Sequence, residues 1–449
     1  MCRAMWFGAA MLGTTAALML NAGAAGFDDP SKAPSPAAPN PAAQTQPPAA
    51  ETAREAMSRA ISGRLSSEAR AKGLAMIAKA EEYLRSRQDK STGGWSMPKP
   101  DKDGKTPPQF PGVSALVLTG MLMDPKADPS KDAALAAGIK YLLNLQQPDG
   151  GIYDKMLPSY NTALSVSALS QVKDPRASEA VRKAVEFLRK LQWGEASDPS
   201  AGGNEAARPV PRDHPFYGGV GYGRSGRPDA SNLNMFMQAL HDAGISPEDD
   251  AVKRALVFIE RTQMDDRVND MPYAKGSRQG GMIYSTVDKA ESVDSRPGQS
   301  QAGSFEETLS DGTKASRLRA YGSMTYAGFK SYVYARLKRD DPRVVAAYDW
   351  IRRNYSVDEN PGMGSEGQYY YYVVFARALK EWGDPNIQLL NEKNEPTGKS
   401  RNWREDLINK LAALQNPDGS FKSVSDRWME NNPDLITAYA LVALRAAVE

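Results

Sequence analysis

Residues 141–154 read YLLNLQQPDGGIYD, and residues 411–423 read LAALQNPDGSFKS. Both stretches place a leucine-rich run before a glutamine, and then a Pro-Asp-Gly turn and an aromatic residue. In such a turn proline presets its own backbone angle, aspartate can bond the local backbone, and glycine tolerates a positive φ. The pattern therefore predicts a helix that ends near the glutamine, a tight turn, and the start of a second helix.

The same pattern recurs along the chain, which indicates an internal repeat. Helical runs end at Gln88, Gln146, Gln192, Gln263 and Gln415, and Asn354 takes this position in a sixth run. Each loop leads to a second run dense in small and apolar residues, and these runs span 113–121, 161–169, 231–240, 321–335, 369–379 and 436–444. The first helix of each pair has one solvated face, whereas the second is apolar almost all round. Six buried helices inside six amphipathic ones predict an all-α fold, an (α/α)6 toroid.

Charge and cysteine content limit the classes of partner and site. The chain has 449 residues, of which 56 are basic and 54 acidic, so its formal net charge is only +2. Because no run of like charge stands out, we expect neither nucleic acid nor an anionic membrane surface as a partner. The only cysteine is Cys2. After removal of the N-terminal segment the chain would therefore have no disulfide and no thiolate zinc ligand.

The N-terminus differs in composition from the rest of the chain. Arg3 precedes an apolar stretch over residues 5–20, and Ala22-Gly23-Ala24 follows it. This pattern predicts a signal peptide over residues 1–24 and a secreted or periplasmic protein, and an uncleaved anchor stays open as the alternative. We expect a Pro/Ala-rich disordered linker over 25–58 and a single toroid domain over 59–449. The polar stretch 285–317 is predicted to be an insertion, either a flexible lid or disordered.

The repeated glutamine, glycine and aromatic residue on paired helices resemble the repeat of squalene and oxidosqualene cyclases and of protein prenyltransferase β-subunits. This resemblance to the prenyltransferase/squalene-oxidase repeat covers roughly residues 66–449, and it implies a terpenoid cyclase-like toroid. The stretches GGVGYGRSGRPDASN (218–232) and YDWIRRNYSVDENPGMG (348–364) look like an uncharacterised secreted bacterial branch of that superfamily. The resemblance implies a fold and no particular reaction.

The catalytic residues that this resemblance would imply are missing. Protein prenyltransferases hold zinc with Asp, Cys and His, whereas only His214 and His241 are available here, so we expect no metal and no other cofactor. Squalene-type cyclases carry Asp-x-Asp-Asp at the start of an inner helix. The corresponding openings, 158–161, 229–232 and 434–437, lack that cluster, and we interpret Asp229 and Asp434 as helix N-caps.

Two further motifs have a plain structural interpretation. The stretch QMDDRVND (263–270) superficially resembles a magnesium-binding motif, but it stands where other repeats have their turn, so we expect solvated turn carboxylates. The stretch GYGRSG (221–226) satisfies Gly-x-Gly-x-x-Gly without a βαβ unit around it, which argues against a dinucleotide site.

Aromatic and polar residues are concentrated where the loops enter the inner helices. In a toroid these junctions collect at one mouth of the central cavity, and a concave aromatic surface with a few polar groups is typical of a ligand pocket. The alternative is that the tyrosines fill the core. The candidate ligand-binding residues are Tyr217, Tyr222, Arg227, Asp229, Asn232, Tyr284, Arg319, Tyr321, Thr325, Tyr326, Tyr369, Tyr372, Trp428 and Glu430.

The leading hypothesis is a toroid that binds a ligand or partner in its central cavity without the known catalytic sets. An isoprenoid cyclase or isomerase and a carbohydrate-active enzyme, each with a different catalytic set, are alternatives. A structural envelope protein is a third possibility. The ligand would accordingly be an isoprenoid or a carbohydrate, and both an enzyme and a non-catalytic binding protein fit the sequence.

Overall fold

The computed structural model describes residues 65–195, 209–223 and 226–449, which belong to one compact unit. The predicted signal peptide, the predicted linker and residues 59–64 lie outside the described residues. Residues 196–208 and 224–225 lie outside them as well, so GYGRSG is described only in part.

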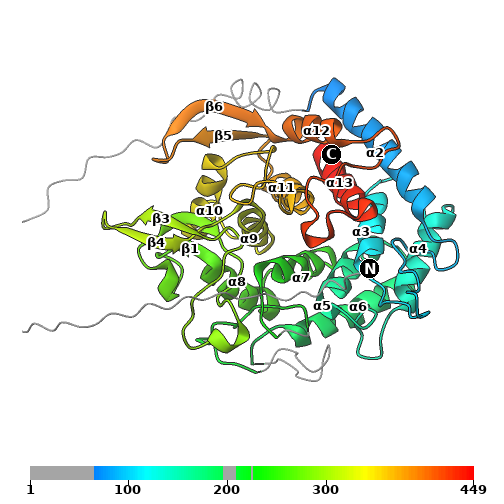
Figure 1. Ribbon diagram of the computed structural model, residues 1–449, viewed down its shortest axis with the longest axis horizontal. Coiled ribbons are helices and arrows are strands. Elements are labelled where there is room, and N and C mark those ends of the chain that lie inside the picture. Colours follow the sequence, from blue (N-terminus) through cyan, green and yellow to red (C-terminus); the bar gives the residue numbers. More distant parts are fainter. Residues whose placement is uncertain (1–64, 196–208, 224–225) are drawn as a thin grey trace, which may run out of the picture. The chain divides into compact units, whose positions relative to one another are not determined.

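The described residues form twelve α-helices, which alternate along the chain between an outer and an inner position (Figure 1). The outer helices are α2 (Ser67–Arg87), α4 (Ala133–Asn144), α6 (Pro175–Leu191), α8 (Asp250–Thr262), α10 (Pro342–Arg353) and α12 (Trp403–Leu414). The inner helices are α3 (Pro111–Leu122), α5 (Pro158–Leu169), α7 (Ala230–Asp242), α9 (Gly322–Tyr334), α11 (Gln368–Trp382) and α13 (Pro433–Val448).

The inner helices close into a ring. Each one packs against the next, and α13 packs against α3, while every outer helix packs against the inner helix of its own repeat or of a neighbouring one. Burial follows the pattern expected from the sequence. In α3 every residue from Pro111 to Met121 is buried, whereas in α6 burial is confined mainly to a stripe that includes Ala177, Ala184 and Leu188. The predicted (α/α)6 toroid is confirmed.

The repeated glutamine joins successive outer helices. In five repeats its Nε2 donates one hydrogen bond to a glycine carbonyl in its own loop and a second to a carbonyl of the next outer helix. We call this arrangement the glutamine clasp. The clasps are Gln88 to Gly93 and Ala134, Gln146 to Gly150 and Ala180, Gln192 to Gly218 and Ala251, Gln263 to Gly280 and Arg343, and Gln415 to Gly419 and Met76. The last clasp ties α12 to α2 and so closes the outer ring, because its two residues lie 339 positions apart in the sequence.

The glycine of each clasp explains the second half of the motif. All five of these glycines have a positive φ between 81° and 94°. At each one an added Cβ would lie 1.8–2.7 Å from a backbone oxygen of the next outer helix, such as Arg254 O for Gly218 and Lys79 O for Gly419. Only glycine combines this backbone angle with so close an approach. Glutamine and glycine therefore contact the same neighbouring helix, at two positions that are three residues apart.

The repeat that carries Asn354 has no glutamine clasp. Asn354 Nδ2 donates to Trp350 O within its own helix, at 2.8 Å. Its loop is held from the inside, because Asn360 Oδ1 accepts from the N–H of Ser323 at the start of α9, at 2.8 Å. A hairpin of β5 (Asn386–Leu390) and β6 (Pro396–Asn402) follows α11, and β5 packs beside α10.

Short antiparallel hairpins accompany the helices, although the sequence shows no convincing run of alternating strands. They are β1 (Gln263–Asp265) with β2 (Arg278–Met282), β3 (Ser304–Thr308) with β4 (Lys314–Leu318), and β5 with β6. The pair β3–β4 and the short 3-10 helix η2 (Ala290–Ser292) lie within the polar stretch 285–317. Ser285, Thr286 and Val287 are fully buried. Of the two alternatives for this stretch, a flexible lid or disorder, the structure shows neither: part of the stretch pairs in a hairpin and its first residues pack inward.

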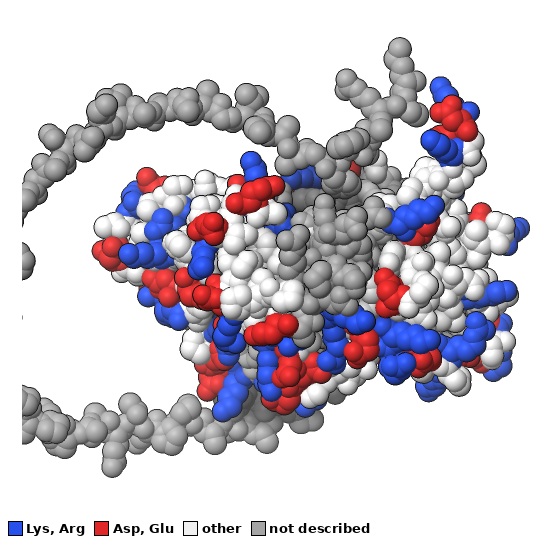
Figure 2. Space-filling model, turned by 90° about the horizontal axis from the view of Figure 1, so that it is seen from below, with Lys and Arg blue, Asp and Glu red and all other residues white. Residues whose placement is uncertain are grey.

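The described surface carries mixed charge. Figure 2 shows basic and acidic side chains interspersed over the visible face. Among the described helices, none combines the length and the apolar composition that a bilayer crossing requires.

Candidate functional site

The N-terminal turns of the inner helices meet at one end of the ring. There the hydroxyls of Tyr160 on α5 and Tyr439 on α13 lie 3.0 Å apart, and the hydroxyl of Tyr370 on α11 lies 3.0 Å from Asn234 Nδ2 on α7. We call this end the tyrosine mouth. It consists of Asp229, Glu430, Tyr160, Tyr222, Tyr284, Tyr321, Tyr370 and Tyr439.

Asp229 is the central carboxyl group of the tyrosine mouth. It caps α7, as the sequence predicts. Its Oδ1 accepts from the backbone N–H of Asn232 at 2.9 Å, and its Oδ2 accepts from Asn232 Nδ2 at 2.8 Å. The residue is only 1% exposed. Burial raises the pKa of Asp229 to about 6, because the cost of burying a negative charge outweighs these two hydrogen bonds.

Tyrosines from several segments surround Asp229. Burial raises the pKa of Tyr160, Tyr222, Tyr284, Tyr321 and Tyr370, and the negative charge of Asp229 adds to the rise in each case. Four of the five are nevertheless half-buried, Tyr321 being the exception. Side chains that are largely surrounded by protein and still reached by solvent are suited to line a recess. The tyrosine mouth therefore places several such tyrosine side chains near the buried carboxyl group of Asp229.

Glu430 supplies a second carboxyl group. Its Oε1 accepts from the backbone N–H groups of Tyr369 at 2.9 Å and Tyr370 at 3.1 Å, so it binds the N-terminal turn of α11. Burial raises the pKa of Glu430 to about 7, against the effect of these hydrogen bonds. Tyr370 links the two acids, because its N–H binds Glu430 while its hydroxyl lies 3.3 Å from Ser231 Oγ, two residues after Asp229.

Several buried oxygens in this region lack a hydrogen-bond partner among the described residues. They are Asn232 Oδ1, Asn234 Oδ1 and Glu430 Oε2. A buried polar atom without a partner costs about 1–3 kcal/mol. These three oxygens are acceptors, and the tyrosine hydroxyls near them can both donate and accept hydrogen bonds.

The structure brings part of the predicted site together. Tyr222, Asp229, Tyr284, Tyr321 and Glu430 belong to the tyrosine mouth, and Asn232 is bonded to Asp229 there. Trp428 and Arg227 lie close to it. The Trp428 ring lies beside Gly367, which caps α11, and Trp428 is 39% exposed. Arg227 Nη1 donates to the carbonyls of Val287 and Asp288, and the guanidinium lies 5.6 Å from the Tyr284 ring.

Other predicted residues belong to the core. Tyr326, Tyr369 and Tyr372 are fully buried. The rings of Tyr369 and Tyr372 lie in contact on one face of α11, and their hydroxyls donate to the backbone carbonyls of Lys422 and Val357. Thr325 is fully buried and its Oγ1 accepts from the N–H of Met282. The side chains of these four residues face neighbouring helices and loops, so the structure places them in the core and not at the tyrosine mouth.

The two remaining candidates lie elsewhere. The Tyr217 hydroxyl donates to Glu195 Oε2 at 3.2 Å, and the residue is 6% exposed. Its ring lies beside Gly194, the second residue after the clasp residue Gln192. The guanidinium of Arg319 lies 4.6 Å from the Phe305 ring in the β3–β4 hairpin. Neither contact belongs to the tyrosine mouth.

Sequence reasoning missed Tyr160, Tyr370 and Tyr439. The helix period places Tyr369 and Tyr372 on one face of α11 and Tyr370 on another. The structure turns the face with Tyr369 and Tyr372 toward the core and leaves Tyr370 half-buried. A signal was available, since Tyr160 and Tyr370 both occupy the third position of an inner helix. An alignment of the inner helices by their first residues would have paired them.

Two acidic residues have surroundings that differ from the expectation. Asp434 does not cap α13; Asn432 caps it, and Asp434 is buried, forms an ion pair with Arg87 at 3.0 Å and accepts from Ser96 Oγ. Asp265, expected to be solvated, is fully buried and accepts from Arg267 Nε at 2.8 Å. In the described part of the chain no three His, Cys, Asp or Glu side chains are arranged to hold a metal ion.

The histidines lie outside the tyrosine mouth. His214 stacks on Trp193 with ring centroids 5.9 Å apart, and its Nδ1 accepts from the N–H of Phe216. His241 lies in the last turn of α7 and stacks on Tyr334 at 3.8 Å.

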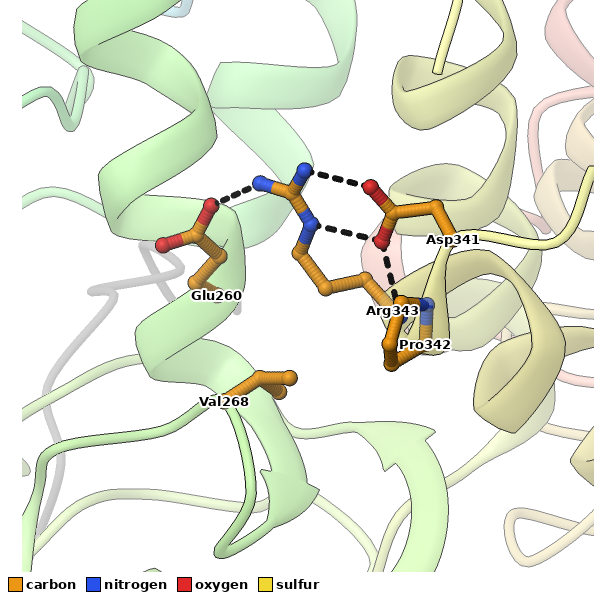
Figure 3. A pocket seen from close by; sticks show the side chains of 5 residues that line it. All are labelled: Glu260, Val268, Asp341, Pro342 and Arg343. Carbon is orange, nitrogen blue, oxygen red and sulfur yellow. Dashed lines mark hydrogen bonds and ion pairs between the residues drawn. The ribbon is translucent and has the colours of Figure 1, made fainter. Parts of the chain in front are cut away.

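A cleft on the outer wall is occupied by a salt-bridge network. It has a volume of about 290 Å³ and is lined by Glu260, Val268, Asp341, Pro342 and Arg343 (Figure 3). Arg343 donates to both oxygens of Asp341, at 2.9 Å and 2.6 Å, and to Glu260. Its backbone carbonyl also accepts from the clasp residue Gln263. The charged groups of this cleft are therefore bound to one another, and they join α8 to α10.

Comparison with known proteins supports the fold. No family model matches this chain, and no curated protein matches it. Among solved structures, an unsaturated glucuronyl hydrolase specific for heparin is similar, with 12% identity, a TM-score of 0.50, and coverage of 84% of this chain and 97% of that chain. A family 76 glycoside hydrolase from a bovine Bacteroides thetaiotaomicron strain is similar with 11% identity, a TM-score of 0.50, and coverage of 82% and 77%. At these identities the likeness establishes the fold alone. The chain is thus similar in fold to solved α/α toroid proteins.

Proposed function

We propose that the tyrosine mouth binds a carbohydrate and that Asp229 acts there as a proton donor to a glycosidic oxygen. The observation that carries this proposal is the group of half-buried tyrosine side chains near a buried carboxyl group whose pKa is raised to about 6. We propose that these side chains line a recess. A carboxyl group that keeps its proton near neutral pH is suited to general acid catalysis.

The polarity of the recess favours a ligand rich in hydroxyl groups. The tyrosine mouth contains tyrosine hydroxyls, and two amide oxygens and Glu430 Oε2 are buried there without a hydrogen-bond partner among the described residues. An isoprenoid offers no hydrogen bonds, so it would bury these groups without partners at a cost for each. A sugar offers several hydroxyls that both donate and accept.

An exposed aromatic side chain lies beside the recess. Trp428 packs next to Gly367 at the start of α11, and Arg427 lies over its ring at 4.3 Å. Its backbone is left-handed, with φ of 54°, which is unfavourable for a bulky residue. A strained and partly exposed indole suits an apolar platform at the entrance of a binding site better than a core position.

The proposed reaction is hydrolysis of a glycosidic bond. Asp229 gives its proton to the bridging oxygen while the bond from that oxygen to the sugar carbon breaks. Water adds its hydroxyl to the sugar carbon, and its proton restores the carboxyl group. Glu430, with a pKa near 7, is the second acid of the same recess.

Isoprenoid binding is the second candidate. It rests on the repeat of glutamine, glycine and aromatic residue, which resembles the repeat of squalene cyclases and prenyltransferase β-subunits. We also propose that the protein acts in the periplasm or outside the cell. That proposal rests on the apolar stretch 5–20 and the small residues after it, which lie outside the described residues.

Titration calorimetry with neutral and acidic oligosaccharides tests the binding. Tyr370→Phe removes a hydroxyl from the recess and should weaken binding by about 1 kcal/mol or more, because one hydrogen bond is lost. Tyr369→Phe is the matched control, since its hydroxyl binds Lys422 O in the core. If both variants bind equally well, or if squalene binds and no oligosaccharide does, the carbohydrate assignment is wrong.

Release of reducing ends tests the catalytic step. Turnover should fall as pH rises through about 6, because Asp229 then loses its proton. Asp229→Asn should abolish turnover and retain binding, since asparagine can still cap α7. Binding without any turnover in the wild-type protein would reject the enzyme and keep the binding protein.

A stability measurement checks the pKa independently of any ligand. Between about pH 4 and pH 6 folded Asp229 holds a proton that the unfolded chain has released, so the free energy of unfolding should decrease as pH rises, by about 1–3 kcal/mol in total. Glu430 adds a slope of the same sign up to about pH 7. Asp229→Asn should remove only the first contribution.

A further inference from the structure

The opposite end of the inner ring holds a separate cavity. It has a volume of about 190 Å³, and the C-terminal ends of all six inner helices contribute to its wall. From α7 come Gln238, His241 and Asp242, from α9 Tyr334, and from α11 Arg377, Lys380 and Glu381. The cavity is smaller than the sites that hold drug-sized ligands, which limits it to a small molecule.

Arg377 is an unpaired guanidinium in this cavity. Among the described residues it has neither a hydrogen bond nor an ion pair, although it is half-buried. Arg343 in the outer cleft shows the usual arrangement, because Asp341 and Glu260 bind its guanidinium. The five donors of Arg377 therefore remain available to a ligand, and a guanidinium pairs best with a carboxylate through two parallel hydrogen bonds.

The other charged groups of the cavity also have neighbours within the protein, and the contacts of Asp242 involve its Oδ1. Asp242 accepts from Gln238 Nε2 at 2.9 Å and lies 3.5 Å from His241 Nδ1. Lys380 pairs with Glu449. Lys330 lies behind the wall, where its Nζ donates to Gln238 Oε1 at 2.6 Å and stands 5.3 Å from the Tyr334 ring. Burial lowers the pKa of Lys330 well below its usual value, and the positive charge of Arg377 adds to this effect.

Negative potential is also present at this end. Six helix C-termini converge here, and each carries a partial charge of about −0.5. The carboxylates of Asp242 and Glu381 add to it. Arg377 would attract a simple anion, but the carboxylates and helix C-termini would repel it. A molecule with one negative and one positive end would be attracted by both kinds of group.

We propose that this cavity binds a small zwitterion of the amino-acid type, with its carboxylate on Arg377 and its ammonium group toward Asp242 and Glu381. This site is separate from the tyrosine mouth and does not depend on the carbohydrate proposal. It would make the protein responsive to a small metabolite at the end of the ring opposite the tyrosine mouth.

Calorimetry with the full chain and three matched probes tests the proposal, starting with alanine, propionate and ethylamine and extending to the other free amino acids. At least one amino acid should bind at least about tenfold more tightly than its des-amino acid and its amine, because only the zwitterion uses both sets of charges. Equal affinity for the acid or the amine, or no binding by any amino acid at tens of millimolar, overturns the proposal.

Variants assign the binding to Arg377. Arg377→Gln should abolish it, and Arg377→Lys, which keeps the charge and loses the two-pronged geometry, should weaken it by about tenfold. Arg182→Gln, at an exposed arginine that pairs with Glu179 on α6, is the matched control and should bind as the wild-type protein does. If Arg377→Gln does not fold, the affinity of Arg377→Lys still tests the assignment. An unchanged affinity in that variant would show that the ligand does not bind Arg377.

Discussion

The loops at the five clasped junctions of the outer ring and the loop after α10 are held by different contacts. At a clasped junction glutamine and glycine bind the next outer helix directly, as Gln263 and Gly280 do with α10. After α10 the loop is instead held from inside by Asn360, and Arg352 Nε donates to Gln388 O of the β5–β6 hairpin at 2.7 Å. A toroid therefore tolerates one junction without the motif, provided that other side chains bind the loop.

The comparison bears on the tyrosine mouth. Tyr222 and Tyr284 lie in loops that follow the clasp residues Gln192 and Gln263, whereas Tyr370 stands on the helix that follows the unclasped loop. Glu430 and Asn360 hold this part of the chain in place of a clasp. The repeat motif thus positions Tyr222 and Tyr284 at the tyrosine mouth, whereas residues outside the motif position Tyr370.

The largest effect is expected from Gly218→Ala at a clasped junction. An added Cβ would lie 1.8 Å from Arg254 O, and the residue has φ of 81°. The overlap with rigid backbone and the left-handed conformation together should lower the free energy of unfolding by about 3–5 kcal/mol. Chemical denaturation measures this, and a loss below about 1 kcal/mol would show that the close approach is not rigid.

Gln263→Ala should have the next largest effect. The side chain is fully buried, donates to Gly280 O and Arg343 O, and accepts from the Tyr332 hydroxyl. Its removal leaves these groups without partners, which should cost about 2–3 kcal/mol of unfolding free energy. Binding at the tyrosine mouth should weaken as well, because Tyr284 follows this clasp. If α10 is displaced and the unfolding free energy of Gln263→Ala is unchanged, the lost hydrogen bonds do not contribute the expected stability.

Gly364→Ala tests the unclasped loop with the same substitution as Gly218→Ala. Gly364 has φ of 61°, but an added Cβ would meet no atom within 4 Å. Only the cost of a left-handed backbone remains, about 1 kcal/mol. Thermal unfolding of the two alanine variants side by side measures the contribution of the close helix approach to stability. If both variants lose the same stability, the two kinds of junction do not differ in this respect.

The smallest effect is expected from Asn354→Ala. Its amide donates only to Trp350 O in its own helix, so the change should cost less than about 1 kcal/mol. Denaturation of Asn354→Ala beside Gln263→Ala compares the same motif position in the two settings. A cost for Asn354→Ala as large as that for Gln263→Ala would mean that the unclasped junction depends on this residue after all.

The sequence by itself determined the twelve helices, the toroid and the positions of the clasps. These features are local, because a 3.6-residue pattern of burial and the turn chemistry of Pro-Asp-Gly act within each repeat. It also indicated Asp229 as a helix cap, since a cap depends on residues close by in the chain.

Only the tertiary structure decided which side chains form the sites. The direction in which Tyr369 and Tyr370 point depends on how α11 is rotated against its neighbours, and the raised pKa values of Asp229 and Glu430 depend on burial among residues from several repeats. Arg377 is unpaired for the same reason, because its surroundings come from six different helices. Rotation, burial and charge balance arise from contacts distant in sequence, and no single repeat encodes them.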